Sequence, residues 1–376
     1  MALVKYPWVL AGAGLSSLLA ASALQPSASR SAELQVWPPF VLVAGLLLIG
    51  LVADDDGLFA AAGHRLARSA RSGMVLFCGA VSMIGMVTAI LNLDTSVAFL
   101  TPVLVYAARS RGEGEAPLLY GCLLLSNAGS LFLPGSNLTN LIVLGHLHMN
   151  GGEFLARMGA GALASLVVTA AVIGVLERRS LRVRADYLIP AERPALGIGV
   201  VAILAATVSV VVLHNAAIPV AAIGLVAVGA RLRTGKENLR HVSDVLGLPV
   251  LIGLFGVAVA LGTLGRSWSG PAELLSHLDR WVTAAAAAIS SVMVNNLPAA
   301  SLLAAGRVQH PFSLLVGLDL GPNLFATGSL AWILWFRAAQ RAGARPSIPR
   351  ASRLGLIAVP LSMAAALGAL VLTGLR

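Results

Sequence analysis

The sequence predicts an all-α polytopic integral membrane protein, and its composition and the length of its apolar stretches both support this prediction. Of the 376 residues, 57% are apolar and only 11% are charged, whereas a soluble protein is about 25% charged. Several apolar stretches reach the roughly 17–25 residues that a membrane-spanning helix needs. A solvent-facing globular enzyme is therefore excluded, and any function of the chain belongs inside the bilayer.

The few charged residues give a formal net charge of +10. In a membrane protein such a basic excess reports which loops face the cytoplasm, so we expect no nucleic-acid partner. Cys78 and Cys122 both lie in apolar stretches, which excludes a disulfide scaffold or a zinc cluster. We therefore expect no metal and no cofactor, and we place the protein in the plasma or inner membrane with a cytoplasmic N-terminus.

The first predicted element is an N-terminal transmembrane helix within residues 1–35, centred on the apolar run 9–20. A cleaved signal peptide is the alternative, because Lys5 precedes this run and Ala21-Ser22-Ala23 follows it.

The next apolar run, 38–53, ends at three consecutive acids, Asp54-Asp55-Asp56. Residues 57–70 then carry His64 and several arginines among alanines and leucines. This mixture is typical of a short helix that lies in the membrane interface.

A long apolar run over 74–108 is interrupted at 92–95 by Asn92-Leu93-Asp94-Thr95. Both of its flanks are basic, so both should be cytoplasmic, which a single span cannot achieve. A re-entrant hairpin with a polar tip buried in protein resolves the conflict. The flanking arginines are Arg65, Arg68 and Arg71 on one side and Arg109 and Arg111 on the other.

The rest of the chain completes about nine full spans and two re-entrant hairpins. In order, it contains a broken helix over 118–145, spans over 154–176, 195–213, 216–229 and 246–264, a hairpin over 281–305 with its tip at 295–298, a broken helix over 312–336 and a last span over 354–372. Two basic loops then lie on the cytoplasmic side, with Arg178, Arg179, Arg182 and Arg184 in the first and Arg231, Arg233, Lys236 and Arg240 in the second.

The two halves of the chain repeat each other at their interruptions. Ser130-Leu-Phe-Leu-Pro-Gly-Ser136 matches Asn323-Leu-Phe-Ala-Thr-Gly-Ser329, and Asn92-Leu93 matches Asn296-Leu297. The predicted directions of the two broken helices are opposite, so we expect inverted repeats at 36–180 and 246–376, joined by connecting spans and loops at 181–245. Paired interrupted segments of this kind indicate the midplane binding site of a secondary transporter.

Half-helices that end inside the membrane expose backbone N–H or C=O groups and a dipole end. Amide and hydroxyl side chains beside these ends replace the hydration shell of a small polar solute or a cation. Only two acids fall within apolar segments, and an ionisable group there is functional by default. The candidate substrate- or ion-binding residues are Asn92, Asp94, Thr95, Asn127, Ser130, Ser136, Asn137, Asn295, Asn296, Asp319, Asn323, Thr327 and Ser329.

The two acids have alternative, purely structural roles. Asp94 is the leading candidate for proton or cation coupling, and its alternative is to cap the second hairpin arm by accepting hydrogen bonds from free N–H groups. Asp319 is either a transport residue or a cap before Gly321-Pro322.

Three segments resemble a known family. Asn92-Leu-Asp-Thr-Ser-Val-Ala-Phe-Leu-Thr-Pro102 resembles the first hairpin of the ion transporter superfamily. Val294-Asn-Asn-Leu-Pro298 and Leu318-Asp-Leu-Gly-Pro-Asn-Leu-Phe-Ala-Thr-Gly-Ser-Leu-Ala331 resemble its arsenite/antimonite permease branch. The hairpin tips lack the Ser-Asn-Thr of the related sodium/dicarboxylate symporters.

This resemblance implies an inverted-repeat transporter that exports trivalent arsenic and antimony hydroxides in exchange for protons. The expected partners are then a small inorganic solute, a coupling proton or sodium ion, and the lipid bilayer. Some family members dock a cytosolic ATPase, so such a subunit is one possible protein partner. A second copy of the chain, in a homodimer, is the other.

Other functions fit the same residues. Two cysteines cannot form a three-thiolate arsenic site, so an oxygen-lined cavity must serve, and such a cavity also suits a dicarboxylate, sulfate, phosphate or sodium ion. The alternatives are therefore a sodium- or proton-coupled anion transporter and a cation/proton antiporter. A membrane-embedded Mg²⁺ transferase at Asp54-Asp55-Asp56 is less favoured, because no second acidic cluster is present. His146, His148 and His214 form no metal-ligand set, so we expect them to be solvated or structural histidines.

Overall fold

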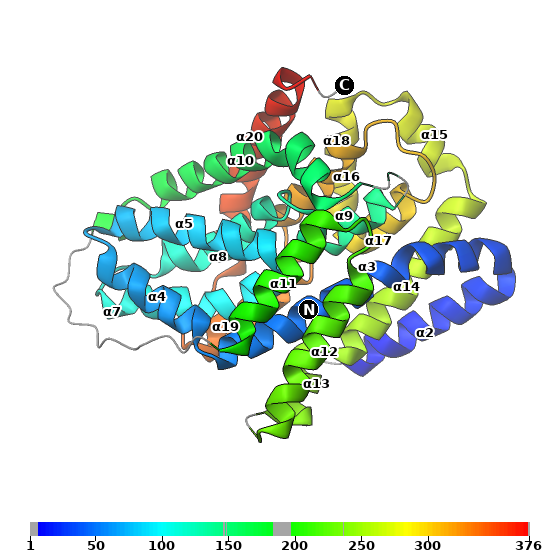
Figure 1. Cartoon of the computed structure of the whole chain (residues 1–376). Helices are drawn as coiled ribbons and strands as arrows, with labels where there is room; N and C mark the ends of the chain where they lie inside the picture. The colour runs from blue at the N-terminus through cyan, green and yellow to red at the C-terminus, as the bar shows by residue number, and fades with distance from the viewer. Residues whose placement is uncertain (1–6, 146, 148, 183–196, 236, 375–376) are drawn as a thin grey trace.

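A computed structural model describes residues 7–145, 147, 149–182, 197–235 and 237–374, and within these ranges the ordered elements are all helices (Figure 1). The predictions for Lys5, His146, His148, Arg184 and Lys236 lie outside them, whereas His214 is exposed as expected. Among the described residues, five helices are long and apolar enough to cross a membrane, as expected of a polytopic membrane protein. These are Pro26–Asp55, Gly73–Ile90, Gly151–Leu176, Leu239–Ser267 and Ile348–Leu372.

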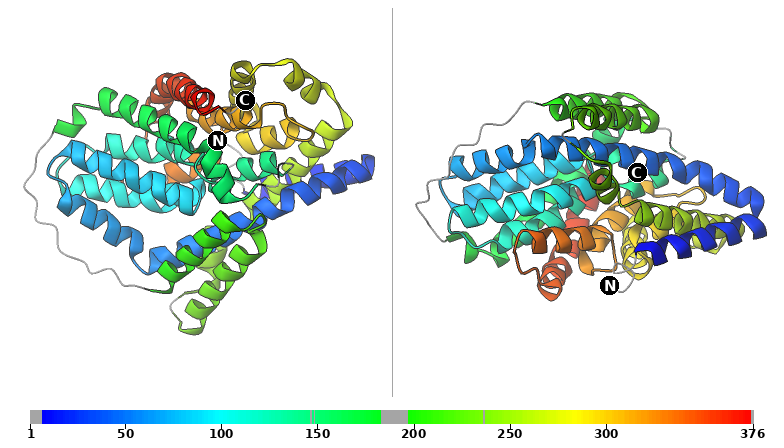
Figure 2. Two further views of the ribbon diagram at one scale, coloured as in Figure 1. Left: turned by 45° about the horizontal axis from the view of Figure 1, so that its top comes forward. Right: turned by 90° about the horizontal axis from the view of Figure 1, so that it is seen from below.

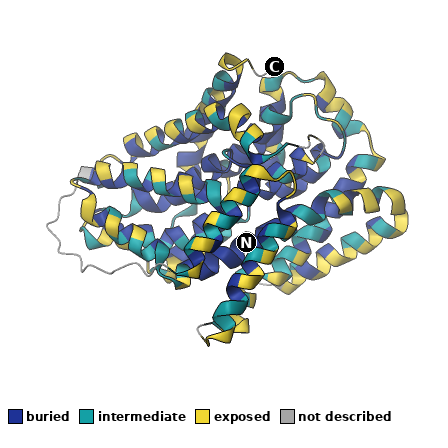
Figure 3. Ribbon diagram, viewed as in Figure 1, coloured by how far each residue is buried: buried dark blue, intermediate teal, exposed yellow. Residues whose placement is uncertain are grey.

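The exposed faces of the outer helices are apolar, which explains how such a protein is accommodated in a bilayer. On α11 (Ile198–Val212), Val201, Leu204 and Val208 lie on one face and are each more than half exposed. A contiguous apolar stripe of this kind is unfavourable in water and suits lipid. In Figure 3, exposed residues are concentrated on the outer helices and buried residues at the centre.

The N-terminal part consists of α2 (Pro7–Leu24) and α3 (Pro26–Asp55). Helix α3 begins at Pro26, well before the predicted run at 38–53, so the predicted boundary between residues 35 and 36 falls inside a helix. Pro38 and Pro39 lie within α3, where neighbouring helices make such residues tolerable in a membrane protein. The buried side of α3 packs against α12 (Ala217–Arg233), α11 and α14 (Leu248–Ser267); α11 and α12 lie over it in both views of Figure 2.

The apolar run 74–108 forms the predicted helix–turn–helix. It consists of α5 (Gly73–Ile90), the single turn α6 (Leu93–Thr95), a wider π-helical turn at Ser96–Leu100 and α7 (Thr101–Ser110). Helix α4 (Leu58–Ser69), the predicted interface helix, lies beside both arms. Arg111 after α7 donates from Nη1 to the carbonyl of Ala67 at 2.9 Å, so both basic flanks meet at one end of the molecule.

The first broken helix follows as α8 (Ala116–Gly129), the 3-10 turn η2 (Pro134–Ser136) and α9 (Leu138–Leu144). Helix α10 (Gly151–Leu176) runs back to the basic end, where the short turn η3 (Ser180–Arg182) follows it. There Arg350, in α20 (Ile348–Leu372), donates two hydrogen bonds to the carboxylate of Glu177. Helices α10 and α20 pack along each other.

The second half repeats this order of elements. After α13 (Leu239–Leu246) and α14, it contains α15 (Gly270–His277), the hairpin arms α16 (Arg280–Val294) and α17 (Asn296–Leu303), and a broken helix made of α18 (Pro311–Leu320), the turn η4 (Gly321–Leu324) and α19 (Ala331–Arg341). All the predicted interruptions are therefore present, within a few residues of their expected places.

The N-terminal helix crosses a helix of the second half closely, at glycine residues of both helices. An added Cβ at Gly14 of α2 would run into the backbone of Gly253 in α14, and an added Cβ at Gly256 would run into that of Gly14. Small residues that let two backbones approach are a common basis of helix association in membranes.

Gly14→Ala tests this crossing, with Gly12→Ala as its matched control on the same helix, since an added Cβ at Gly12 meets no atom within 4 Å. Alanine favours a helix over glycine by about 1 kcal/mol, but forcing atoms into a packed contact costs about 1–3 kcal/mol. We expect Gly14→Ala to lower the thermal unfolding midpoint in detergent and Gly12→Ala to leave it unchanged or raise it. Equal midpoints for the two variants would contradict the crossing.

Candidate functional site

The centre of the molecule holds a fully buried carboxylate, Asp319, in the last turn of α18. Ser130 donates from Oγ to Oδ2 at 2.8 Å, and Thr139 Oγ1 and Asn137 Nδ2 donate to Oδ1 at 2.6 and 3.0 Å. In the described part of the chain, no basic side chain forms an ion pair with Asp319. Three neutral donors from the first broken helix thus hold a charge-bearing group of the second.

A pair of amides makes a second link between the two broken helices. Asn127 donates from Nδ2 to Oδ1 of Asn323 at 2.8 Å, and Asn323 donates from Nδ2 to the carbonyl of Leu124 at 3.0 Å. Both amides are buried. In both links an earlier residue of one break contacts a later residue of the other. Asn127 contacts Asn323, and Asp319 contacts Ser130.

Two residues at the start of α9 also lie at the candidate site, although the sequence pattern did not predict them. Thr139 binds Asp319, and Asn140 donates from Nδ2 to the carbonyls of Ser130 and Leu133 at 2.7 and 3.3 Å. The signal was present, because Asn140 follows Asn137 by three residues and so lies on the same face of a helix. We call the following set the central polar cluster: Asn127, Ser130, Asn137, Thr139, Asn140, Asp319 and Asn323.

The first hairpin tip is capped by Asn92, whose Oδ1 accepts a hydrogen bond from the N–H of Thr95 at 2.6 Å. The alternative role of Asp94 as the cap is therefore wrong. The Asp94 carboxylate is partly exposed and accepts no hydrogen bond from a described residue.

The second hairpin tip is a strained turn at Asn295, the only non-glycine residue with positive φ (76°) in the described ranges. Its ψ of 149° places it near a region that normally requires glycine, and such strain concentrates at functional sites. The N–H of Asn296 donates to the carbonyl of Gly328 at 2.8 Å, and Thr327 donates from Oγ1 to that of Val292 at 2.7 Å. The tip is thereby bound to the break of the second broken helix.

The remaining predicted residues lie at the margins of the cluster. Ser136 donates to the carbonyl of Ala89 at the end of α5 at 3.1 Å. Ser329 is buried, whereas Thr327 is exposed, so Thr327 supports the second tip from outside the buried cluster.

Several buried polar atoms at these breaks have no hydrogen-bond partner among the described residues. Leaving such groups unsatisfied in an apolar interior is costly, so they are rare unless they serve a ligand or another function. They are Asn92 Nδ2, Thr95 Oγ1, Asn127 Oδ1, Asn140 Oδ1 and Ser329 Oγ.

Asp56, the last of the three consecutive acids and the residue that follows α3, has a structural role. Asp56 forms an ion pair from Oδ1 to Arg231 Nη2 at 2.8 Å, and its Oδ2 accepts a hydrogen bond from the N–H of Gly199 at 2.7 Å. This single carboxylate therefore joins the ends of α3, α11 and α12.

Comparison with known proteins identifies the class. A family model described as "citrate transporter" (CitMHS) matches residues 6–336, so the chain belongs to the citrate transporter family. An arsenical pump membrane protein of Escherichia coli is 25% identical over 338 residues, which cover 80% of this chain and 78% of that protein. An uncharacterized transporter of Mycobacterium tuberculosis strain H37Rv is 26% identical over 371 residues, which cover 87% and 84%.

A solved structure shares the fold. The crystal structure of the Alcanivorax borkumensis YdaH transporter, described as having an unusual topology, matches with a TM-score of 0.51 at 15% identity and covers 93% of this chain and 88% of that one. These findings confirm the resemblance to the arsenite permease-like branch of the ion transporter superfamily. The chain is a multi-pass membrane transporter of small solutes, so the alternative of an Mg²⁺ transferase is wrong.

Asp319→Asn tests the carboxylate link. The amide nitrogen of the new asparagine would face a hydrogen-bond donor on the first broken helix. At least one buried hydrogen bond, worth about 1–3 kcal/mol, would then be lost. We expect a lower thermal midpoint for this variant in detergent and no change for Asp244→Asn, a carboxylate exposed on α13. A wild-type midpoint in Asp319→Asn would show that the link contributes nothing to stability.

Proposed function

We propose that the protein exports arsenite and antimonite, as neutral trihydroxides, in exchange for protons. One observation carries the proposal: the central polar cluster offers buried acceptors without donors, Asn127 Oδ1 and Asn140 Oδ1, beside a carboxylate. In the hydrogen bonds and ion pairs of the described residues, no Arg, Lys or His meets this cluster. A neutral trihydroxide brings O–H donors to such a site, whereas citrate brings three negative charges that the cluster does not neutralise.

The cysteines support an oxygen-lined site. Cys122 is buried and accepts a hydrogen bond from Thr101 Oγ1 at 3.3 Å, while Cys78 is exposed. Trivalent arsenic prefers thiolates, but these two thiols form no pair. Weaker binding by oxygens favours release of the solute on the far side of the membrane.

The reciprocal contacts support inverted repeats at 36–180 and 246–376. Ser130 and Asn323 occupy matching positions of the two motifs, and each contacts a residue three or four positions before the other, Asp319 and Asn127 respectively. An approximate two-fold relation between two copies of one motif places contacts in this way. In the proposed cycle, the hairpins and broken helices move against α3, α11, α12 and α14, with the solute at the crossing of the breaks. The meeting of both basic flanks of α5–α7 at one end supports a re-entrant hairpin and a cytoplasmic location for that end.

Hydrogen bonding divides the two acids between two roles. Asp319 is fully buried with three donors, so protonation would break existing bonds, and its role is to hold the broken helices together. Asp94 carries a proton in and out without breaking a hydrogen bond to any described residue. Asp94 is therefore assigned to coupling and Asp319 to the solute site.

Arsenite transport is tested by expression in bacterial cells that lack arsenite efflux. The protein should restore growth on arsenite and lower cell-associated arsenic, and everted vesicles that contain it should accumulate arsenite but not citrate. Vesicles that accumulate citrate, sulfate or phosphate instead would favour the anion-transporter alternative and overturn the arsenite proposal.

Matched amide variants test the site itself. Asn127→Leu and Asn140→Leu remove the unpartnered acceptors and should lower the arsenite uptake rate by about tenfold or more, the equivalent of one buried hydrogen bond. Asn215→Leu, an exposed amide before α12, should have no effect. Similar rates in all three variants, at equal amounts in the membrane, would place the solute elsewhere.

Proton coupling is tested by Asp94→Asn in everted vesicles. Uptake should lose its dependence on an imposed pH gradient while movement down an arsenite gradient persists, because only the proton carrier is removed. Unchanged dependence on the pH gradient would exclude Asp94 from coupling. Stimulation of the wild-type protein by a sodium gradient alone would favour the sodium-coupled alternative.

A further inference from the structure

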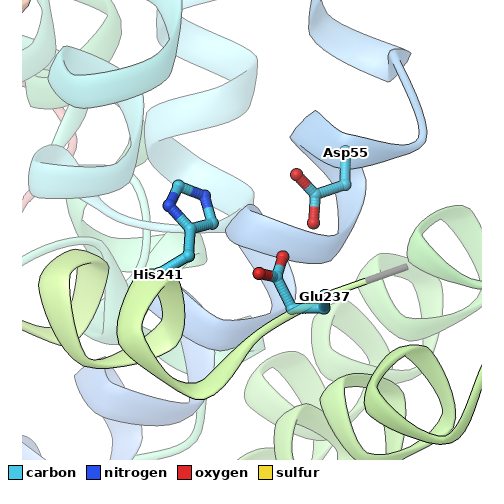
Figure 4. A group of neighbouring side chains, drawn as sticks. All are labelled: Asp55, Glu237 and His241. Carbon is cyan, nitrogen blue, oxygen red and sulfur yellow. The ribbon is translucent and has the colours of Figure 1, made fainter. Parts of the chain in front are cut away.

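Three potential metal ligands from distant parts of the chain converge where α3 ends. Asp55 lies in the last turn of α3, Glu237 precedes α13, and His241 lies in the first turn of α13. One ligand atom from each residue lies within 4.8 Å of the other two. Figure 4 shows the three side chains directed toward a common space.

The backbone around these residues fixes two of the ligands. Asn238 caps α13, its Oδ1 accepting from the N–H of His241 at 2.8 Å. The N–H of Asn238 donates to Oε1 of Glu237 at 2.8 Å. Asn238 therefore fixes the backbone of His241 and one carboxylate oxygen of Glu237.

Two carboxyl groups meet at this place. A carboxylate oxygen of Asp55 and one of Glu237 lie within 4.8 Å of each other, and among the described residues neither carboxylate forms an ion pair with an arginine or lysine. The neighbouring Arg231 is already paired with Asp56. Two carboxylates in such proximity require a shared proton or a cation between them.

We propose that Asp55, Glu237 and His241 bind a divalent transition-metal ion of the zinc class. Imidazole with carboxylate suits such ions, whereas Mg²⁺ and Ca²⁺ prefer oxygen ligands alone. Ligand atoms about 2 Å from a tetrahedral Zn²⁺ lie roughly 3.3 Å apart, so small rotations of these largely exposed side chains close the site. Three protein ligands leave one position open to water, as in exchangeable rather than closed structural sites.

The ion would fasten α13 to the end of α3. None of the residues of α13 is fully buried, and its apolar contact with the core is made by the partly buried Val242 and Leu246. The site lies where α3 and α12 end and α11 begins, away from the central polar cluster. The inference does not depend on the transported solute. It is also distinct from the rejected transferase site, since only Asp55 of the three consecutive acids contributes.

Zinc binding to the full-length, untagged protein in detergent tests the proposal. After treatment with a chelator, titration with ZnCl₂ should show one saturable site by calorimetry and a rise in the thermal midpoint, and MgCl₂ at the same concentration should produce neither. Glu237→Gln and His241→Gln should each weaken zinc binding by about tenfold or more. Asp244→Asn, on the same helix, should bind like the wild type.

Two outcomes would overturn the site: no saturable zinc binding by the wild-type protein, or binding unchanged in both Glu237→Gln and His241→Gln. Each variant should retain the thermal midpoint of the metal-free wild type, since the ligands are largely exposed, so a loss of binding is not confused with unfolding. The readout is binding rather than transport, and a failed arsenite experiment therefore leaves it unaffected.

Discussion

The buried carboxylate of Asp319 is the constraint on which the centre of the molecule depends. An acid in an apolar interior is tolerated only where donors surround it, and Ser130, Asn137 and Thr139 supply them across the two halves of the chain. These donors reach Asp319 only because α8 ends at Gly129 and α9 begins at Leu138. The burial of Asp319 therefore depends on the breaks in the helices.

The broken helices leave backbone carbonyls that also need partners, and neutral side chains provide them. Asn140 binds the carbonyls of Ser130 and Leu133, Asn323 binds that of Leu124, and the indole N–H of Trp332 donates to that of Pro322 at 2.7 Å. The centre is consequently rich in hydrogen-bonding groups and poor in charge. Such a centre suits the neutral trihydroxide that we propose as the solute better than a multiply charged anion.

The scarce charges work at the ends of the helices instead. Arg109, at the end of α7, donates to the carbonyls of Ala342 and Gly343 after α19 at 2.8 and 2.9 Å, and Asp56 joins the ends of three helices. In the transport cycle that we propose, the fixed helix ends are the rigid parts and the hydrogen-bonded breaks are the movable ones.

The sequence by itself determined the helical membrane fold and the places where helices stop. Both are local properties of the sequence. The length of an apolar run defines a span, and Gly, Pro and Asn residues interrupt it. Helices end at or near such residues, at Ile90, Gly129, Val294 and Leu320. Only the tertiary structure decided which polar groups meet. Thr139 binds Asp319 across 180 positions of the chain, and Asn92 rather than Asp94 caps the first tip. Glu237 and His241 likewise approach Asp55 only through helix packing. Hydrogen-bond partners far apart in the chain are selected by packing and carry no local pattern, so neither spacing nor composition predicts them.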